Sequence, residues 1–170
     1  MTNQDNLYGL AQRLGGLLRQ RGLKLATAES CTGGWVGQAI TSVPGSSEWY
    51  DRGIIAYSNQ AKQDMLGVSE TTLGRFGAVS EQTVTEMVSG ALQRSGADLA
   101  LAISGVAGPG GGTGEKPVGI VCFAWGRKGA EAVVETRYLQ GDRAAVRRQA
   151  VEIALQRMLD LVGVPSDAAQ

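Results

Sequence analysis

Residues 23–34 of the chain are Leu23-Lys24-Leu25-Ala26-Thr27-Ala28-Glu29-Ser30-Cys31-Thr32-Gly33-Gly34, and this stretch decides the class of fold. Its first half is short, mostly apolar and free of glycine and proline, which predicts a buried strand over 23–28. A helix is predicted over 33–42, because Pro44-Gly45 is a strong turn signal just beyond it. A strand that passes into a helix through a tight turn is typical of α/β proteins, and Ser30 lies in that turn.

Helices and strands continue to alternate on both sides of this stretch. Leucines recur at three- and four-residue spacing between positions 7 and 18, which predicts an amphipathic helix over 6–21 that Gly22 ends. The remaining predicted elements are a strand at 53–57, a short helix capped by Asn59 and ended by Gly67, a helix at 80–95, a strand at 99–104, an irregular glycine-rich segment at 105–117, a hairpin of 118–124 with 132–139, and a helix from its cap Asp142 to 162. Together they predict a three-layer α/β/α sandwich with a mixed, mostly parallel sheet, as one domain over residues 1–165 with a loose tail at 166–170.

Length and composition limit the classes of protein to consider. The chain has 170 residues, of which 43% are hydrophobic, enough for one domain with a buried core. Its 16 lysines and arginines balance its 16 aspartates and glutamates, so no net positive field would hold a nucleic acid. The first six residues lack the basic start and apolar run of a signal peptide, and no stretch is long and apolar enough to span a bilayer. We therefore expect a cytoplasmic protein without a nucleic-acid or membrane partner.

Histidine is absent from the whole sequence, and this absence restricts the chemistry more than any other count. Imidazole is the commonest general base and the commonest ligand of transition metals. A Ser-His-Asp triad, a Cys-His dyad and an HExxH zinc site are therefore excluded, and two cysteines are too few for a zinc site built on thiolates. Acid–base chemistry must fall to lysine, carboxylate, tyrosine or serine.

The glycine-rich segment 105–117 matches no standard phosphate-binding motif. It contains no Gly-Lys-Ser/Thr of a Walker A sequence, and its glycines do not follow the GxGxxG spacing of a dinucleotide fold. The chain likewise has no GxSxG elbow and no SxxK pair. The segment is either a flexible surface connection or a ligand site. Its position directly after a predicted buried strand favours a site, because ligands bind at strand ends in α/β sheets.

Ser30 is the first candidate for catalysis. Gly33 and Gly34 allow close backbone packing at a helix start, whose free N–H groups can stabilise an oxyanion or a phosphate. The alternative is that Ser30 or Thr32 only caps the helix, which is the commoner role for such a residue. Cys31 is a rival nucleophile, but no histidine is present to form its thiolate.

A serine nucleophile without histidine needs a neutral lysine or a hydroxyl relay to take its proton. Lys62 fits, since it follows a predicted strand end and lies in the first turn of the short helix, where the dipole lowers the pKa of an amine. The alternative for Lys62 is an ordinary exposed lysine. Three arginines at the head of the last predicted helix, Arg143, Arg147 and Arg148, suit a phosphate or a carboxylate, or else belong to a solvated face.

Five longer segments of the sequence are more specific to one protein family than these local signals. They are residues 27–34, Tyr57-Ser58-Asn59-Gln60-Ala61-Lys62, Gly77-Ala78-Val79-Ser80, residues 104–112 with Lys116-Pro117-Val118-Gly119, and Gly141-Asp142-Arg143 before Val146-Arg147. Taken together and in this order, they resemble the CinA C-terminal domain family, the nicotinamide-nucleotide amidohydrolases of the PncC type. The resemblance covers nearly the whole chain, from about residue 7 to residue 162.

The resemblance implies hydrolysis of the carboxamide of nicotinamide mononucleotide to nicotinate mononucleotide and ammonia, a step of pyridine-nucleotide recycling that needs no metal or cofactor. It implies Ser30 as nucleophile, Lys62 as its activating base and Ser104 as a hydroxyl relay or hydrogen-bond donor. The residues expected to bind this small-molecule nucleotide, with Arg143 or Arg147 on its phosphate, are Thr32, Gly33, Gly34, Tyr57, Asn59, Gly108, Gly110, Gly111, Arg143 and Arg147. The family also implies a three-layer mixed sheet and a homodimer or larger homo-oligomer.

Three other functions stay open at this point. A binding module that senses a nucleotide without hydrolysing it would use the same glycine-rich segment and arginines, and release of ammonia separates it from a hydrolase. An amidohydrolase acting on a different small amide would share the chemistry. A structural or recombination-associated role is suggested only by the family's historical name, and the neutral charge disfavours direct DNA binding.

Overall fold

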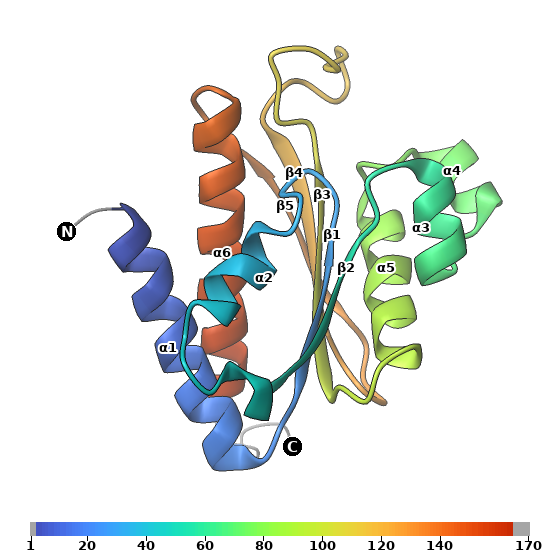
Figure 1. Ribbon diagram of the computed structural model, residues 1–170. Coiled ribbons are helices and arrows are strands. Elements are labelled where there is room, and N and C mark those ends of the chain that lie inside the picture. The colour runs from blue at the N-terminus through green and yellow to red at the C-terminus, as the bar shows by residue number, and fades with distance from the viewer. Residues whose placement is uncertain (1–2, 165–170) are drawn as a thin grey trace.

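The computed structural model describes residues 3–164, so the tail expected at 166–170 lies outside the described residues. The helices are α1 (Asn3–Arg21), α2 (Trp35–Thr41), α3 (Asn59–Leu66), α4 (Glu70–Phe76), α5 (Glu81–Gln93) and α6 (Arg143–Gly163), with a short 3-10 helix η1 (Ser46–Glu48). The strands are β1 (Leu25–Glu29), β2 (Tyr50–Ile55), β3 (Leu99–Gly105), β4 (Ile120–Arg127) and β5 (Val133–Tyr138). They form three layers, with α1, α2 and α6 on one face of the sheet and α3, α4 and α5 on the other (Figure 1). This is the predicted α/β/α sandwich.

The five strands form one mixed sheet in the order β2-β1-β3-β4-β5. β1 pairs in parallel with both β2 and β3, whereas β4 is antiparallel to both β3 and β5. The predicted mixed sheet is therefore confirmed, with β4 as the reversed strand. Because β1, β2 and β3 are parallel, the segments that follow them emerge at the same edge of the sheet. Ser30, Lys62 and Ser104 all come from this carboxyl edge.

Successive residues of β3 face opposite layers and differ in size. Leu99, Leu101 and Ile103 belong to the core that α1, α2 and α6 cover, whereas Ala100 and Ala102 belong to the core on the side of α5. Side chains alternate across a strand, so the sequence pattern itself assigns large residues to one face and small residues to the other. The small residues allow α5 to pack closely on the sheet.

Two features near the site differ from the sequence predictions. The helix α4 was not predicted, because its threonines and glycine are weak helix formers. It is stabilised by Ser69, whose Oγ accepts from Thr72 N–H at 3.0 Å, and by burial of Leu73. The cap of α3 is Ser58 rather than Asn59, since the Ser58 side chain accepts a hydrogen bond from the helix and Asn59 is already the first helical residue.

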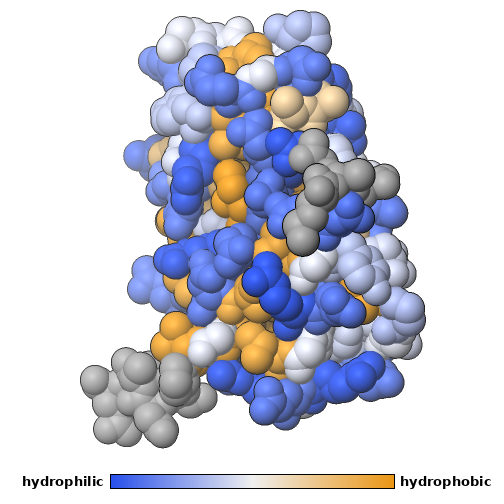
Figure 2. Space-filling model, turned by 90° about the vertical axis from the view of Figure 1, so that its left-hand side faces the viewer, coloured by the Kyte–Doolittle hydropathy of each residue, from blue (hydrophilic) through white to orange (hydrophobic). Residues whose placement is uncertain are grey.

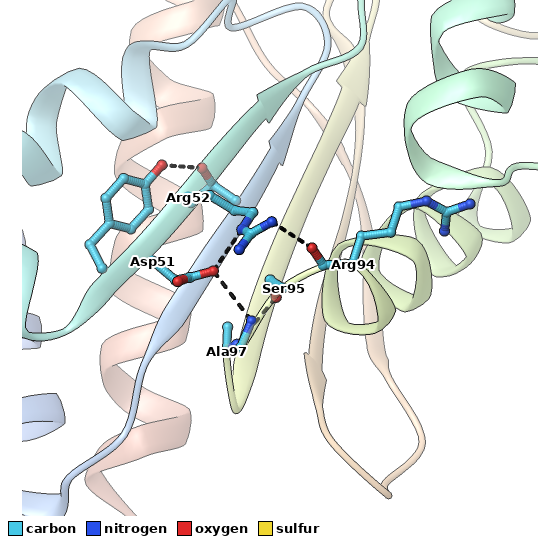
Figure 3. Close-up of polar contacts among 8 residues, drawn as sticks. Asp51, Arg52, Arg94, Ser95 and Ala97 are labelled. Atoms are coloured by element: carbon cyan, nitrogen blue, oxygen red, sulfur yellow. Dashed lines mark hydrogen bonds and ion pairs between the residues drawn. The ribbon is translucent and has the colours of Figure 1, made fainter.

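Polar contacts hold the opposite edge of the sheet, where β2 and β3 begin. Arg52 donates to the Asp51 carboxylate and to the carbonyl of Arg94, each at 2.7 Å (Figure 3). The N–H of Gly96 donates to the same Asp51 carboxylate at 3.3 Å. The hydrogen bond from Arg52 lowers the pKa of the Asp51 carboxyl. These contacts tie the start of β2 to the loop between α5 and β3.

The outer face of the layer that contains α1 is mostly hydrophilic (Figure 2). Hydrophobic residues form a band between hydrophilic ones on this face, and the band widens toward its lower end. Most large apolar side chains of α1 and α6 instead lie in the core on this side of the sheet. In the part of the chain that the structure describes, no helix has the length and apolar character needed to cross a membrane.

Candidate active site

Ser30 and Lys62 form a buried polar pair at the carboxyl edge of the sheet. Ser30 directly follows β1, and Lys62 is the fourth residue of α3, the helix that follows β2. Lys62 Nζ lies 3.0 Å from Ser30 Oγ. Lys62 is 1% exposed and Ser30 7% exposed, so the interpretation of Lys62 as an ordinary surface lysine is wrong. A buried amine within hydrogen-bond distance of a hydroxyl is an arrangement that can activate serine without histidine.

Two backbone carbonyls hold the amine of Lys62. Nζ donates to the carbonyl of Ala56 at 3.1 Å and to that of Tyr57 at 3.3 Å. None of the ion pairs within residues 3–164 includes Lys62. Burial, rather than the helix dipole, is the main cause that lowers the pKa of Lys62, because desolvation disfavours the ammonium form. A neutral amine with both N–H groups on carbonyls has its lone pair left for the hydroxyl proton of Ser30.

Ser30 and Thr32 do not cap α2, so that alternative is wrong. The N-cap is Gly34, and two free N–H groups of the first helical turn donate instead to the Glu29 carboxylate, at 2.9 and 3.1 Å. The hydroxyl of Thr32 donates to the same carboxylate at 2.7 Å. With the helix start satisfied in this way, the Ser30 hydroxyl remains available to Lys62.

The backbone of the turn requires glycine at two consecutive positions. Gly33 and Gly34 have φ angles of 61° and 98°, in the left-handed region that side chains disfavour. A Cβ on Gly34 would also come within 2.8 Å of Ile55. These positive φ angles keep both glycines out of the helix, so α2 begins at Trp35 rather than at residue 33 as predicted.

Cys31 is poorly suited to act as the nucleophile. Its side chain is buried, and desolvation raises the pKa of the thiol to about 11. A thiol with this pKa stays protonated at neutral pH, and the thiol is a far weaker nucleophile than the thiolate. The geometry therefore favours its neighbour Ser30.

Ser104 lies at the end of β3 and is 1% exposed. Its hydroxyl donates to the carbonyl of Ala78 at 2.8 Å, in the segment between α4 and α5. Among the residues that the structure describes, Ser104 makes no hydrogen bond with Ser30 or Lys62. Ser104 therefore lies at the same edge of the sheet as the Ser30–Lys62 pair, but its hydroxyl connects β3 to the segment between α4 and α5.

Arg143, the first residue of α6, joins the glycine-rich segment to Tyr57. Its Nη1 donates to the carbonyl of Gly108 at 2.9 Å, and its Nη2 donates to the hydroxyl of Tyr57 at 3.2 Å. The carbonyl of Tyr57 accepts from Lys62, so Tyr57 contacts both Arg143 and the Ser30–Lys62 pair. Asn59, the first residue of α3, is exposed. A cleft of about 520 Å³ is lined by Ala107, Pro109, Val118, Gly141, Asp142, Arg143, Ala144 and Arg147.

Arg147 contacts the turn that contains Ser30 rather than the glycine-rich segment. Its Nε donates to the carbonyl of Cys31 at 3.0 Å, and its Nη2 donates to the carbonyl of Thr32 at 3.1 Å. The guanidinium lies 5.5 Å from the ring centroid of Trp35, within the range of a cation–π contact. Arg143 and Arg147 thus line one cleft but contact different segments of the chain.

The glycine-rich segment is irregular, as predicted, but side-chain contacts attach it to the body of the protein. Its buried Gly108 is held by α6, and Lys116 Nζ donates to the carbonyl of Phe76 at the end of α4. Gly108 and Gly111 have φ angles of 86° and 87°, which glycine adopts without strain. Gly110 and Gly111 are exposed at its tip. The attachments favour a wall of the site over a flexible surface connection.

Glu29 is the residue of this site that the sequence analysis missed. It is 1% exposed, and its carboxylate accepts three hydrogen bonds. A charged residue at the end of an otherwise apolar buried strand was the available signal, because a carboxylate is buried only where it has partners. Across residues 3–164, no three side chains of the metal-binding types Cys, Asp, Glu and His come together as a group that could hold a metal ion.

The fold and these contacts define the protein as an α/β/α sandwich with a buried Ser–Lys pair at the carboxyl edge of its sheet. A family model described as the CinA C-terminal domain matches residues 7–162. The chain therefore belongs to the CinA C-terminal domain family.

Similar proteins and solved structures agree with this assignment. The chain is 51% identical to nicotinamide-nucleotide amidohydrolase PncC of Escherichia coli strain K12, over 93% of this chain and 95% of that protein. It is 52% identical to the protein of the same name from Pseudomonas putida, over 92% of this chain and 98% of that protein. The crystal structure of competence/damage inducible protein CihA from Agrobacterium tumefaciens is similar with a TM-score of 0.89 and 44% identity, covering 92% of this chain and 95% of that one.

Proposed function

We propose that this protein hydrolyses the carboxamide of nicotinamide mononucleotide to nicotinate mononucleotide and ammonia. The observation that carries the proposal is the buried contact of 3.0 Å between Ser30 Oγ and Lys62 Nζ. The names of the similar proteins support a nicotinamide nucleotide as the substrate. The cleft is lined by Arg143, whose exposed guanidinium suits a phosphate group.

The proposed reaction is acyl transfer through a covalent intermediate. Ser30 Oγ attacks the amide carbon while Lys62 Nζ takes the hydroxyl proton. The C–N bond then breaks, and the Lys62 ammonium returns that proton to the leaving nitrogen, which departs as ammonia. Water, deprotonated by Lys62, attacks the ester, and Ser30 Oγ leaves with the proton. One water is consumed for each amide converted to an acid and ammonia.

Backbone N–H groups of the turn are the donors that we assign to the oxyanion. Within residues 3–164, the N–H groups of Thr32 and Gly34 donate no hydrogen bond, whereas that of Gly33 is used by the carbonyl of Ser30. Free donors at a fixed turn stabilise the negative charge that develops on the carbonyl oxygen of the substrate.

For the other predicted residues, we assign roles in shaping and binding. Arg143 binds the phosphate, with Tyr57 and Asn59 at the same side of the pocket, because Arg143 is exposed and lines the cleft. The contact of Ser104 with Ala78 supports a role as a hydrogen-bond donor that holds the wall rather than as a proton relay.

The test is incubation of the purified, chelator-treated protein with nicotinamide mononucleotide. We expect nicotinate mononucleotide, followed by liquid chromatography, and ammonia, followed by a coupled assay, in equal amounts. Ser30→Ala should reduce the rate by about a thousandfold or more while leaving the thermal unfolding curve in place. Ser42→Ala, which removes a serine hydroxyl at the far end of α2, is the matched control and should keep the full rate.

Two results would contradict the proposal in different ways. Binding of the nucleotide without release of ammonia would make the protein a nucleotide-binding module. Full turnover by Ser30→Ala would leave the reaction in place but remove Ser30 as its nucleophile.

A further inference from the structure

The turn that contains Ser30 needs restraint from outside, because glycine makes it flexible. Gly33 and Gly34 follow Ser30 closely and both adopt positive φ angles. Glycine loses more conformational freedom on ordering than any other residue. The N–H of Ser30 is tied to β3 by a hydrogen bond of 3.0 Å to the carbonyl of Ile103, but this contact precedes the flexible part. Backbone hydrogen bonds from Gly33 to Ser30 and from Trp35 to Thr32 stay within the turn and the start of α2, so side chains tie the remainder of the turn to the rest of the protein.

The Glu29 carboxylate restrains the turn from the inside. Oε1 accepts from the Thr32 hydroxyl at 2.7 Å and from the N–H of Val36 at 2.9 Å, and Oε2 accepts from the N–H of Gly37 at 3.1 Å. One carboxylate side chain thus connects the last residue of β1, the middle of the turn and the first turn of α2. Three hydrogen bonds from one side chain to two successive segments restrain their relative position.

The Arg147 guanidinium restrains the same turn from the side of α6. It donates to the consecutive carbonyls of Cys31 and Thr32 and packs on the ring of Trp35, the first residue of α2. A Cβ on Gly33 would lie 3.3 Å from Arg147 Nη2, so the guanidinium lies directly against the turn. The planar fork of arginine matches two carbonyls in a way that a lysine ammonium does not.

We propose that Glu29 and Arg147 are positioning residues that hold the turn from two sides and set the Ser30 hydroxyl against Lys62. The amine of Lys62 is itself fixed by two carbonyls, so a shift of the turn changes the distance between the two reacting groups. A displacement of about 1 Å costs on the order of a hundredfold in rate. In this assignment Arg147 acts through Ser30, and the substrate phosphate is bound by Arg143.

Steady-state kinetics of Arg147→Met tests this inference, which rests on the proposed function for its substrate. We expect kcat for nicotinamide mononucleotide to fall by about 10- to 100-fold, with KM changed by no more than about twofold. Arg148→Met is the matched control, because Arg148 is the next residue of α6 but pairs with Glu152 instead of the turn, and it should retain wild-type kinetics. A raised KM at unchanged kcat would assign Arg147 to the substrate phosphate and overturn the inference.

A second measurement does not depend on the substrate. A small sulfonyl fluoride reacts with an activated serine, and mass spectrometry follows the labelling of Ser30. We expect Arg147→Met and Glu29→Gln to be labelled about tenfold or more slowly than the wild type and Arg148→Met at the wild-type rate. Equal labelling of all four proteins would refute the positioning role. If the wild type is labelled but releases no ammonia, the proposed function fails while the positioning role is still decided by the labelling rates.

The labelling test also covers variants that do not fold. If circular dichroism shows that Arg147→Met or Glu29→Gln is unfolded, Arg147→Lys is tested instead. It keeps the positive charge and loses the two-pronged contact, so labelling of Ser30 should still slow by several-fold. Wild-type labelling of a folded Arg147→Lys would show that the charge alone suffices and would contradict the geometric role.

Discussion

Replacing Lys62 by methionine tests, through stability alone, whether its amine is neutral in the folded protein. Lys62 is 1% exposed, and its Nζ is surrounded by the Ser30 hydroxyl and two backbone carbonyls. Burial lowers its pKa below the ordinary value of 10.5, which applies in the unfolded chain. Methionine has a similar length and no charge, so it removes the titrating group while largely filling its volume.

The sign of the expected effect follows from proton binding. Between the lowered pKa of the folded state and 10.5, the unfolded chain holds a proton on Lys62 that the folded protein does not. Stability rises with pH wherever the unfolded state binds more protons, by up to about 1.4 kcal/mol per pH unit for one group. The free energy of unfolding of the wild type, minus that of Lys62→Met, should therefore increase with pH in this window and be constant below it.

Urea unfolding of both proteins, followed by tryptophan fluorescence between about pH 6 and pH 9, measures this difference. This range does not extend above 9.0, the ordinary pKa of the Cys31 thiol, and burial raises that pKa to about 11 in the folded protein. Lys128→Met, in the exposed turn between β4 and β5, is the control and should show a constant difference. A constant difference for Lys62→Met as well would mean that its amine is charged throughout this range and would refute lysine as the base.

Two further substitutions test the pocket and the packing around the site. Arg143→Ala should raise KM for nicotinamide mononucleotide by about tenfold with little change in kcat, because a group that binds the phosphate is lost. Steady-state kinetics measures both constants, and an unchanged KM would show that Arg143 does not bind the substrate. Gly90→Ala should lower the free energy of unfolding by about 2 kcal/mol or more, because the added Cβ would overlap the carbonyl of Leu66 at the end of α3. This overlap outweighs the gain in helix propensity of about 1 kcal/mol, and urea titrations measure the net loss. Gly74→Ala, where a Cβ meets nothing within 4 Å, should instead be neutral or stabilising, so similar losses in both variants would contradict the packing argument.

Local patterns were sufficient for most of the fold. The strand predicted at 99–104, the leucine spacing of α1 and the Asp142 cap of α6 all predicted what the structure contains. These signals work because a strand or helix must bury one face and satisfy its ends wherever it lies in the fold. The helix α4 was missed because weak local propensity is compensated by burial of Leu73, which no local pattern reveals.

The roles proposed for the site residues depended much more on resemblance than on local pattern. From the turn alone, a helix cap was the commoner interpretation of Ser30. That interpretation failed because the Glu29 carboxylate satisfies the start of α2 in its place. The sequence likewise could not separate Arg143 from Arg147, which lie one helical turn apart and yet contact different segments.

By itself, the sequence determined the class of fold and, through the absence of histidine, that a serine nucleophile would need a lysine or a hydroxyl relay. The sequence also singled out Lys62, but only the tertiary structure brings its Nζ to 3.0 Å from Ser30 Oγ, because residues 32 positions apart meet here only after β1 and β2 pair in parallel. Tertiary structure also lowers the pKa of Lys62, because burial is a property of the packed chain. The turn that contains Ser30 is predicted from the sequence, whereas the contacts of Glu29 and Arg147 that hold this turn form only in the folded protein.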